Sequence, residues 1–289
     1  MDVSVIIVSY NVKSLLCKCI ESIFDYTQGI DYEVIVVDNA SSDGTIEELK
    51  ERYDSIRLIP SNVNLGFGKA NNEGAKVAKG KYLFFLNPDT LLLNNAILAL
   101  YNFMEGHPNA ALCGGNLFMA DLKPNHSYNM SIPKFRSALE YVLNTSLSRE
   151  SQADTFNNTG EPKRVELVVG ADMFIRKSVF DQIGRFDERY FMYFEEAILS
   201  IKIRGIGMDQ YAVPNARIIH FEGASSIHKF TSKFYLDSFL KYYSTYPYYP
   251  LLYFLLSLKI GMGVLLWKVF RKQEKLSYWM SLYQVLTNK

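Results

Sequence analysis

The sequence contains little cysteine and no excess of charge of either sign, and both features exclude classes of protein. Three cysteines among 289 residues are too few for a disulfide framework. Cys17 and Cys19 are two residues apart in a predicted helix and point to different faces, so we expect no zinc site. Buried, reduced thiols in a cytosolic compartment are the simplest interpretation. The net charge of +1 gives no reason to expect a nucleic-acid partner.

The amino terminus also lacks the features of a targeting segment. The first residues, MDVSVIIVSYN, have no basic stretch and only a short apolar run. We therefore expect a strand here and not a signal peptide. Aromatic residues, in contrast, are abundant, with 20 Tyr and 19 Phe concentrated in the second half. Such residues are typical of an interface, a sugar-binding cleft or a membrane surface.

The first hundred residues alternate between strand and helix patterns. The pattern predicts strands at 3–9, 33–37, 56–59 and 82–86, and helices at 14–26, 45–53 and 67–78. This alternation is typical of parallel β-α-β units. The sequence therefore predicts an α/β fold with a mostly parallel, Rossmann-like sheet and helices on both faces.

The pattern is less regular further along the chain. We expect helices at 94–104, 178–183 and 195–204, and strands at 110–118, 165–175 and 211–219. Residues 119–163 are polar, with weak helical character at 137–147, and such segments more often cover a site than build a core.

Several predicted strands end at polar residues. YLFFLNPDT is the clearest case, because an apolar strand at 82–86 stops at Asn87, Pro88 and Asp89. Similar groups follow or interrupt other strands, namely Ser9, Tyr10 and Asn11; Asp38 and Asn39; Gly170, Ala171 and Asp172; and His220. A single Asp at a strand end is usually a turn former or a helix cap. Convergence of several such ends favours a shared ligand site at the carboxyl edge of the sheet.

Two of these residues could bind a divalent cation. A carboxylate from Asp89 and an imidazole from His220 would suit Mn²⁺ somewhat better than Mg²⁺. The alternative for His220 is a hydrogen-bonded structural histidine. Its place at a strand end, before Gly223, Ser225 and Ser226, favours a ligand.

The loop NVNLGFGKANNEG at 62–74 leaves two alternatives open. Gly66 and Gly68 form half of a dinucleotide fingerprint, which is weak evidence alone. They could simply make a tight turn into a helix. They could also let the backbone approach a nucleotide phosphate or a sugar, with Asn71 and Asn72 as amide donors.

FMYFEE, at 191–196, places Glu195 and Glu196 after aromatic residues. Partial desolvation would raise the pKa of such a carboxyl group and make it a better base. Alternatively, the two acidic residues only begin a helix, where they favour the dipole. Both roles are compatible.

The carboxyl-terminal part combines aromatic and apolar residues. An aromatic helix at 234–243 and the sequence YPYYP precede 17 residues, 251–267, that contain one charge, Lys259. A spanning helix needs about 20 apolar residues. Flanking Tyr246, Trp267 and Lys268 favour a helix at a membrane interface. A buried core or oligomer helix and a true membrane span are the alternatives.

Together these motifs resemble a bacterial family 2 glycosyltransferase with the GT-A fold, in its rhamnosyltransferase-like branch. The resemblance covers residues 3–228 and rests on seven segments in the family's order: VSYN, VDNASSDGT, NLGFGKANNEG, FLNPDT, VVGADMFIRK, FDERYFMYFEE and HFEGASS. It implies a domain at 1–230, with a nucleotide-binding half at 1–110 and an acceptor half at 111–230. A helical segment at 231–289 would associate with a membrane or form an oligomer.

The resemblance implies a role for each matched residue. Donor-site residues would be Ser9, Tyr10, Asn11, Asp38, Asn39, Asn64, Gly66, Asn71, Asn87, Gly170, Ala171 and Asp172. Asp89 and His220 would bind Mn²⁺ or Mg²⁺, and Glu196, with Glu195 beside it, would be the catalytic base. The pair is Glu-Glu where the family has Glu-Asp, and Ile198 stands where a second Asp is common. These differences imply either a different acceptor or a weaker site.

The implied activity is inverting transfer of a hexosyl or deoxyhexosyl group from a nucleotide-diphosphate sugar to a glycan or lipid-linked hydroxyl. This would serve surface polysaccharide synthesis at the cytoplasmic face of the inner membrane. Two alternatives are a non-catalytic sugar-binding or membrane-tethered scaffold and a nucleotidyltransferase. The second would normally carry a glycine-rich and basic loop near its amino terminus, and VSYNVKSLL has none.

Overall fold

The computed structural model describes residues 1–143, 155–221 and 228–287, with the backbone alone for residues 228–232. The chain divides into two units, which are described separately. The described residues of the first unit are 1–132, 155–191 and 195–221, and those of the second are 133–143, 192–194 and 228–287. The predicted domain boundary at residue 230 stays a prediction. The second unit also includes two earlier segments that the sequence analysis did not assign to it.

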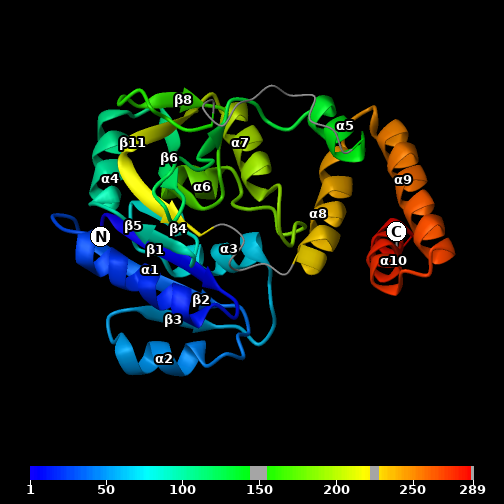
Figure 1. The fold of residues 1–289 in the computed structure, drawn as a ribbon. Coiled ribbons are helices and arrows are strands. Elements are labelled where there is room, and N and C mark those ends of the chain that lie inside the picture. Colours follow the sequence, from blue (N-terminus) through cyan, green and yellow to red (C-terminus); the bar gives the residue numbers. More distant parts are fainter. Residues whose placement is uncertain (144–154, 222–227, 288–289) are drawn as a thin grey trace. The chain divides into compact units, whose positions relative to one another are not determined.

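Strands and helices alternate along the first unit (Figure 1). Its strands are β1 (Val3–Ser9), β2 (Tyr32–Asp38), β3 (Arg57–Pro60), β4 (Tyr82–Leu86), β5 (Thr90–Leu92), β6 (Ala110–Phe118), β7 (Tyr128–Asn129), β8 (Lys163–Val165), β9 (Leu167–Val168), β10 (Asp172–Arg176) and β11 (Asp209–His220). Its helices are α1 (Lys13–Tyr26), α2 (Thr45–Arg52), α3 (Phe67–Val77), α4 (Ala96–Gly106), α6 (Lys177–Gln182) and α7 (Glu195–Gly205).

A nine-stranded sheet forms the centre of the first unit. The strand order is β3-β2-β1-β4-β10-β6-β11-β5, and β8 pairs with β11. Strands β1 to β4, β6 and β11 run in one direction, and β5, β8 and β10 run in the other. The prediction of a mostly parallel α/β sheet is therefore confirmed.

Helices cover both faces of this sheet, as predicted. Because side chains alternate along a strand, Val5 and Ile7 of β1 face one core while Ile6 faces the other. The first core also contains residues of α1, α2 and α4, and the second contains residues of α3, α6 and α7. Burial on two faces explains the continuous apolar runs in β1, β2 and β4.

Two strand predictions need correction. The segment 165–175 is not one strand: β8, β9 and β10 divide it, and β9 pairs with β7 in a separate two-stranded sheet. The break at residues 169–171 lets the carbonyl oxygen of Ala171 accept a hydrogen bond from the N–H of Asn87 (2.9 Å). Strand β5, which begins two residues after Pro88 and pairs with β11, was not predicted from the sequence.

The second unit consists of helices α5 (Phe135–Leu143), α8 (His228–Tyr243), α9 (Tyr249–Val269) and α10 (Gln273–Thr287). The predicted weak helix at 137–147 corresponds to α5, and its residues 144–147 lie outside the described part of the chain. Aromatic side chains fill the interior, where Phe194 stacks on Tyr242 at 4.8 Å and Phe239 lies 4.6 Å from Tyr243. Within the described residues, only α9 is long and apolar enough to cross a membrane, judged by length and composition.

Candidate active site

The carboxyl ends of β1 and β2 lie side by side. Ser9 and Asp38, the last residues of these strands, are partners in the parallel register, and the N–H of Asn39 donates to the Ser9 carbonyl oxygen (2.8 Å). Ser9, Asp38 and Asn39 are all buried. The predicted convergence of these strand ends is therefore present in the structure.

The loops beyond these strands hold a wall of polar side chains in place. Asn11, with a φ of 54°, is bonded to a neighbouring loop in both directions: its N–H donates to Ser41 Oγ (3.0 Å), and its Oδ1 accepts from Ser42 N (2.7 Å). Asp38 Oδ2 accepts from Ser41 N (2.9 Å). Asp38 Oδ1 and Ser9 Oγ are buried with no hydrogen-bond partner among the described residues. Buried polar atoms normally have partners, so these two are candidates for ligand contact. Tyr10 beside them is exposed.

Asn39 joins this wall to the glycine loop. Its Nδ2 donates to the carbonyl oxygen of Gly66 (3.1 Å), and its Oδ1 accepts from the N–H of Leu65 (3.2 Å). Asn64 Oδ1 accepts from Gly66 N (3.0 Å). Asn71 is buried, and its Nδ2 donates to Phe67 O in its own helix (3.1 Å). The amide nitrogen of Asn71 is therefore used for structure, whereas Asn39 and Asn64 shape the loop.

Asp89 and His220 meet although 131 positions separate them in the sequence. The antiparallel pairing of β5 with β11 places His220 opposite Thr90, and the N–H of Phe221 donates to the Asp89 carbonyl oxygen (2.9 Å). As a result, His220 Nε2 lies 3.5 Å from Asp89 Oδ1. The side chain of Asp89 is 3% exposed and that of His220 is 16% exposed. Of the predicted motif at 220–226, residues 222–226, including Gly223, Ser225 and Ser226, lie outside the described part.

This pair fits a divalent cation as two of its ligands. A carboxylate and an imidazole are suitable donors for Mn²⁺, and 3.5 Å is a reasonable separation for two atoms that share one ion. No cluster of three or more His, Cys, Asp or Glu side chains occurs in the described ranges. Further ligands would therefore have to come from the substrate or from water.

The buried thiol of Cys19 contacts the loop that carries Asp89, and this contact was not predicted from the sequence. Cys19 Sγ donates to the carbonyl oxygen of Asn87 (3.6 Å) and lies 3.5 Å from Thr90 Oγ1. Thr90 Oγ1 also donates to Asn87 O (2.7 Å). Burial raises the pKa of the Cys19 thiol to about 12, so it stays protonated. Only the apolar face of the first predicted helix could have indicated that Cys19 points inward.

Ala171 and Asp172 lie next to the same loop but have different roles, and Gly170 precedes them in the chain. The Ala171 carbonyl oxygen holds the N–H of Asn87, as described above. Asp172 is completely buried, and its Oδ2 accepts a hydrogen bond of 2.5 Å from the N–H of Gly115. Burial raises the pKa of this carboxyl group well above its usual range. The hydrogen bond from Gly115 gives Asp172 a structural role, and its Oδ1, like Asp38 Oδ1, is buried with no hydrogen-bond partner among the described residues.

Glu195 and Glu196 begin α7, as predicted. Glu195 is buried, and its Cγ lies 3.5 Å from the position that a Cβ on Gly68 would take. Glu196 is partly exposed, and burial raises the pKa of its carboxyl group. A carboxylate with a raised pKa that remains accessible is the better candidate for a base.

The segment before these glutamates is bonded to α3. Asn72 Nδ2 donates to Phe186 O (3.0 Å) and to Glu188 Oε1 (3.1 Å), and Asn72 Oδ1 accepts from Phe186 N (3.2 Å). Asn72 was proposed from sequence as an amide donor to a ligand. Its side chain instead connects two segments of the protein that are 114 positions apart.

A mostly parallel α/β sheet with polar residues at the carboxyl ends of neighbouring strands is the arrangement in which open α/β sheets bind ligands. Residues 4–184 match the model of the family described as "Glycosyl transferase family 2". The chain belongs to this family, so the predictions of a family 2 member and of an enzyme of the glycosyltransferase class are confirmed.

Two curated relatives are similar over most of the chain. The N-acetylglucosaminyl-diphospho-decaprenol L-rhamnosyltransferase of Mycobacterium tuberculosis is 28% identical over 207 residues, which cover 67% of each chain. Rhamnosyltransferase WbbL of Escherichia coli K12 is 28% identical over 235 residues, 76% of this chain and 83% of that protein. These matches support the rhamnosyltransferase-like branch.

One solved structure with the same fold is that of GalNAc-T7 with UDP, GalNAc and Mn²⁺. Its TM-score is 0.59 at 18% sequence identity, over 86% of this chain. This chain matches about half (52%) of that chain's length. The likeness confirms the GT-A type of fold.

Proposed function

We propose that the protein is an inverting glycosyltransferase that moves a hexosyl or deoxyhexosyl group, with rhamnosyl as the first candidate, from a nucleotide-diphosphate sugar. The acceptor would be a hydroxyl group of a lipid-linked or glycan substrate in surface polysaccharide synthesis. Two rhamnosyltransferases among the relatives support the sugar class, and the decaprenol-linked substrate in one of their names supports the acceptor class.

The observation that carries this proposal is the pairing of Asp89 with His220 at one edge of the sheet. The two side chains come from different strands and lie 3.5 Å apart. The same edge presents Asp38 Oδ1 and Ser9 Oγ, buried and without partners in the described residues. A nucleoside diphosphate needs both kinds of group, polar partners for the nucleoside and a cation for the phosphates.

Asp89 and His220 would hold the divalent cation, and a bound cation would supply charge neutralisation for the diphosphate. Ser9 and Asp38 would bind the base or ribose of the donor, with Asn11 placed by its loop contacts. The bend at Gly66 would allow the backbone to approach the donor. These groups are fixed before the reaction, so they would stabilise the leaving group without reorganisation.

The transfer itself needs one base and one displacement. The Glu196 carboxylate would take the proton of the acceptor hydroxyl. The acceptor oxygen would form a bond to the anomeric carbon while the bond from that carbon to the diphosphate oxygen breaks. The nucleoside diphosphate leaves with the bonding electrons, and the configuration inverts.

A lipid-linked acceptor also implies a place of action. We propose contact with the cytoplasmic face of the inner membrane, because α9 meets the length and composition of a membrane helix. Self-association through the second unit is the alternative use of the same helix.

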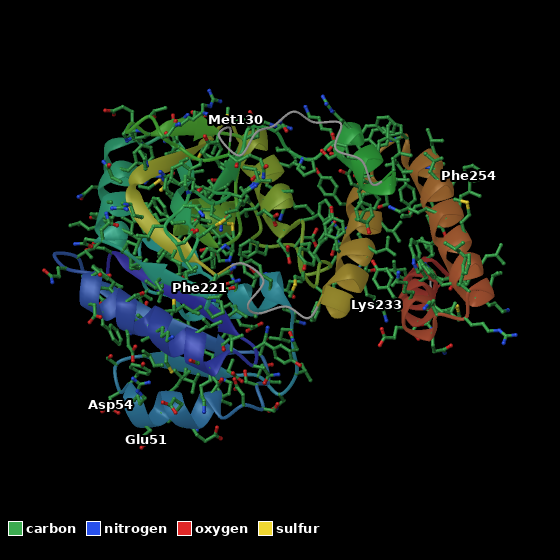
Figure 2. All side chains as sticks on the ribbon, viewed as in Figure 1. Glu51, Asp54, Met130, Phe221, Lys233 and Phe254 are labelled. Carbon is green, nitrogen blue, oxygen red and sulfur yellow. The ribbon has the colours of Figure 1, made fainter. Side chains whose placement is uncertain are left out.

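The proposal can be tested by incubating the full chain with a panel of nucleotide sugars, Mn²⁺ and cell-lipid acceptors. The expected result is release of nucleoside diphosphate that depends on both acceptor and metal. An Asp89→Asn variant should lose this release. The matched control is Asp54→Asn, because Asp54 is exposed beside α2 (Figure 2). Absence of turnover, together with absence of metal-dependent nucleotide binding, would refute the transferase proposal.

A further inference from the structure

One face of α9 is apolar and exposed along its whole length. The exposed apolar residues of this face are three or four positions apart in the sequence, so they form one stripe along the helix. The exposed fractions run from 47% to 68% for Leu251, Phe254, Leu258, Met262, Leu265 and Val269. Figure 2 shows Phe254 on the outer side of this helix. Exposed apolar surface of this extent marks an interaction site.

Helix α9 carries two charged residues: Lys268 lies in its last turn, and Lys259, in its middle, points away from this stripe. Lys259 Nζ donates to the carbonyl oxygen of Tyr141 near the end of α5 (2.9 Å) and lies 5.4 Å from the centre of the Tyr141 ring. Leu252, Leu256 and Ile260 are buried on this inner side. The charge that would oppose membrane burial is therefore satisfied inside the unit.

Helix α10 returns along α9 and forms a hairpin with it. Tyr253 Oη donates to Leu286 O (3.0 Å) near the open end. Further along, the ring of Trp279 fills the space that a side chain on Gly263 would need. Helix α10 carries Glu274 and Lys275, together with exposed Ser277 and Gln284. If α9 crossed a bilayer in this hairpin, these polar groups would enter the hydrocarbon region, where they are costly.

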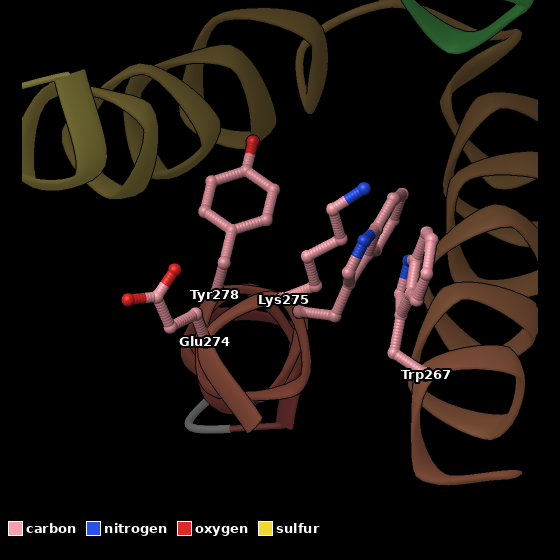
Figure 3. A pocket seen from close by; sticks show the side chains of 5 residues that line it. Trp267, Glu274, Lys275 and Tyr278 are labelled. Carbon is pink, nitrogen blue, oxygen red and sulfur yellow. The ribbon is translucent and has the colours of Figure 1, made fainter. Parts of the chain in front are cut away.

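The turn of the hairpin is basic and aromatic. Lys268, Arg271, Lys272 and Lys275 are exposed there, with Glu274 as the acidic neighbour. Lys275 Nζ lies 4.2 Å from the centre of the Trp267 ring. Trp267, Tyr278 and Trp279 line an open pocket of about 410 Å³ beside them (Figure 3). Indole rings beside basic residues are typical of the interface between lipid and water.

We propose that the α9–α10 hairpin lies in the plane of an anionic membrane surface, with the stripe of α9 in the interface and the basic turn on lipid headgroups. Apolar area and attraction to anionic lipid together set the strength of such binding. This inference deepens the proposed membrane contact and does not depend on the transfer reaction. The competing interpretations are that a second copy of the chain covers the stripe, or that α9 spans the membrane.

The two tryptophans make the experiment specific, because both Trp residues of the chain, 267 and 279, lie in the hairpin. Full-length protein is mixed with vesicles of phosphatidylcholine alone or with phosphatidylglycerol. We expect co-sedimentation and a blue shift of tryptophan emission with the anionic vesicles. Lipids brominated near the headgroup should quench this emission more strongly than lipids brominated near the chain end.

Substitutions in the stripe and in the basic turn test whether these two surfaces bind the vesicles. Leu258→Asp with Met262→Asp should weaken vesicle binding at least about tenfold, and Arg271→Gln with Lys272→Gln about fivefold per charge removed. The matched control, Leu122→Asp with Ile206→Asp, adds the same two charges at exposed apolar positions of the first unit and should bind as wild type does.

Three results would overturn the inference. The first is that the wild type does not bind vesicles, and the second is that lipids brominated near the chain end quench more strongly. The third is that the protein self-associates and the stripe variant abolishes this self-association but leaves vesicle binding unchanged. Nucleoside-diphosphate affinity is measured on the same samples. If the wild type binds the nucleoside diphosphate but not vesicles, only the membrane inference is refuted. If it binds vesicles but not the nucleoside diphosphate, only the transferase proposal is refuted.

Discussion

The carbonyl oxygen of Phe191 lies where a side chain on residue 66 would have to be. The N–H of Phe67 donates to this oxygen (2.8 Å), and a Cβ built on Gly66 would overlap the same atom. Gly66 also has a φ of 80°, in the region that favours glycine. The glycine loop of the donor side and the segment that leads toward the base are thus in direct contact.

Gly66→Ala should therefore destabilise the protein and reduce transfer. The positive φ alone costs about 1–3 kcal/mol, and the overlap with Phe191 adds to it. The free energy of unfolding in urea measures the first effect, and turnover at saturating donor measures the second. Gly160→Ala is the control, since Gly160 has the same φ of 80° with no atom within 4 Å of its Cβ position. Equal losses in both variants would show that the Phe191 contact is unimportant.

The Asp89–His220 pair predicts unequal metal dependence for two variants. His220→Gln removes the imidazole but leaves the carboxylate, so activity should need at least about tenfold more Mn²⁺ and recover at high concentration. Asp89→Asn should not recover at any Mn²⁺ concentration, because the charged ligand is gone. Titration of activity with Mn²⁺ gives both results. His107→Gln, an exposed histidine whose ring stacks on Phe103, serves as the control. Unchanged Mn²⁺ dependence in His220→Gln would exclude His220 as a ligand.

The local patterns of the chain were sufficient to predict the fold. Apolar runs and turn residues located β1, β2 and β4 within a residue or two, and polar strand ends predicted the proximity of Ser9 and Asp38. The sequence also predicted Asp89 and His220 as ligands of one metal ion. The pairing of β5 with β11, which brings the two side chains together, was not predicted. A strand of three residues that follows a proline is too short to give a periodic signal.

Buried polar contacts were harder to infer from sequence. Asn72 and Cys19 bond to backbone atoms of distant segments, and no local pattern indicates such partners. Asp172 belongs to a matched motif and stays a predicted donor-site residue, but the hydrogen bond from Gly115 to its Oδ2 could not be predicted from that motif. Motif membership identifies the neighbourhood of a site, whereas the hydrogen-bond partners of each side chain depend on the fold.

Glu196→Gln should lower kcat by about 10²–10⁴-fold while donor affinity changes little. The amide keeps the size of the side chain but cannot accept the acceptor proton. Burial raises the pKa of Glu196. The pH at which kcat of the wild type falls to half its maximum on the acid side should therefore be higher than the ordinary pKa of glutamate. Glu51→Gln, on the exposed side of α2 (Figure 2), is the control. An equal loss of donor binding would indicate a binding role for Glu196.

Asp172→Asn should be tolerated and should change how stability depends on pH. Burial raises the pKa of Asp172 in the folded protein, so the folded state holds its proton more tightly than the unfolded state does. The stabilisation from this group is complete below the unfolded pKa of about 3.9 and is lost as pH rises through the folded pKa. Each unit by which the folded value exceeds the unfolded one corresponds to about 1.4 kcal/mol.

The asparagine side chain can still accept the hydrogen bond from Gly115 without becoming charged. The variant should therefore match the wild type in acid and gain stability relative to it at neutral and higher pH, as measured by urea unfolding at several pH values. Asp172→Ala removes the acceptor and leaves a buried N–H unpaired, which costs about 1–3 kcal/mol relative to Asp172→Asn at every pH. If Asp172→Asn instead lost stability as pH rises, the folded protein would need the ionised carboxylate, and Asp172 would have to be counted among the groups that meet the cation or the donor.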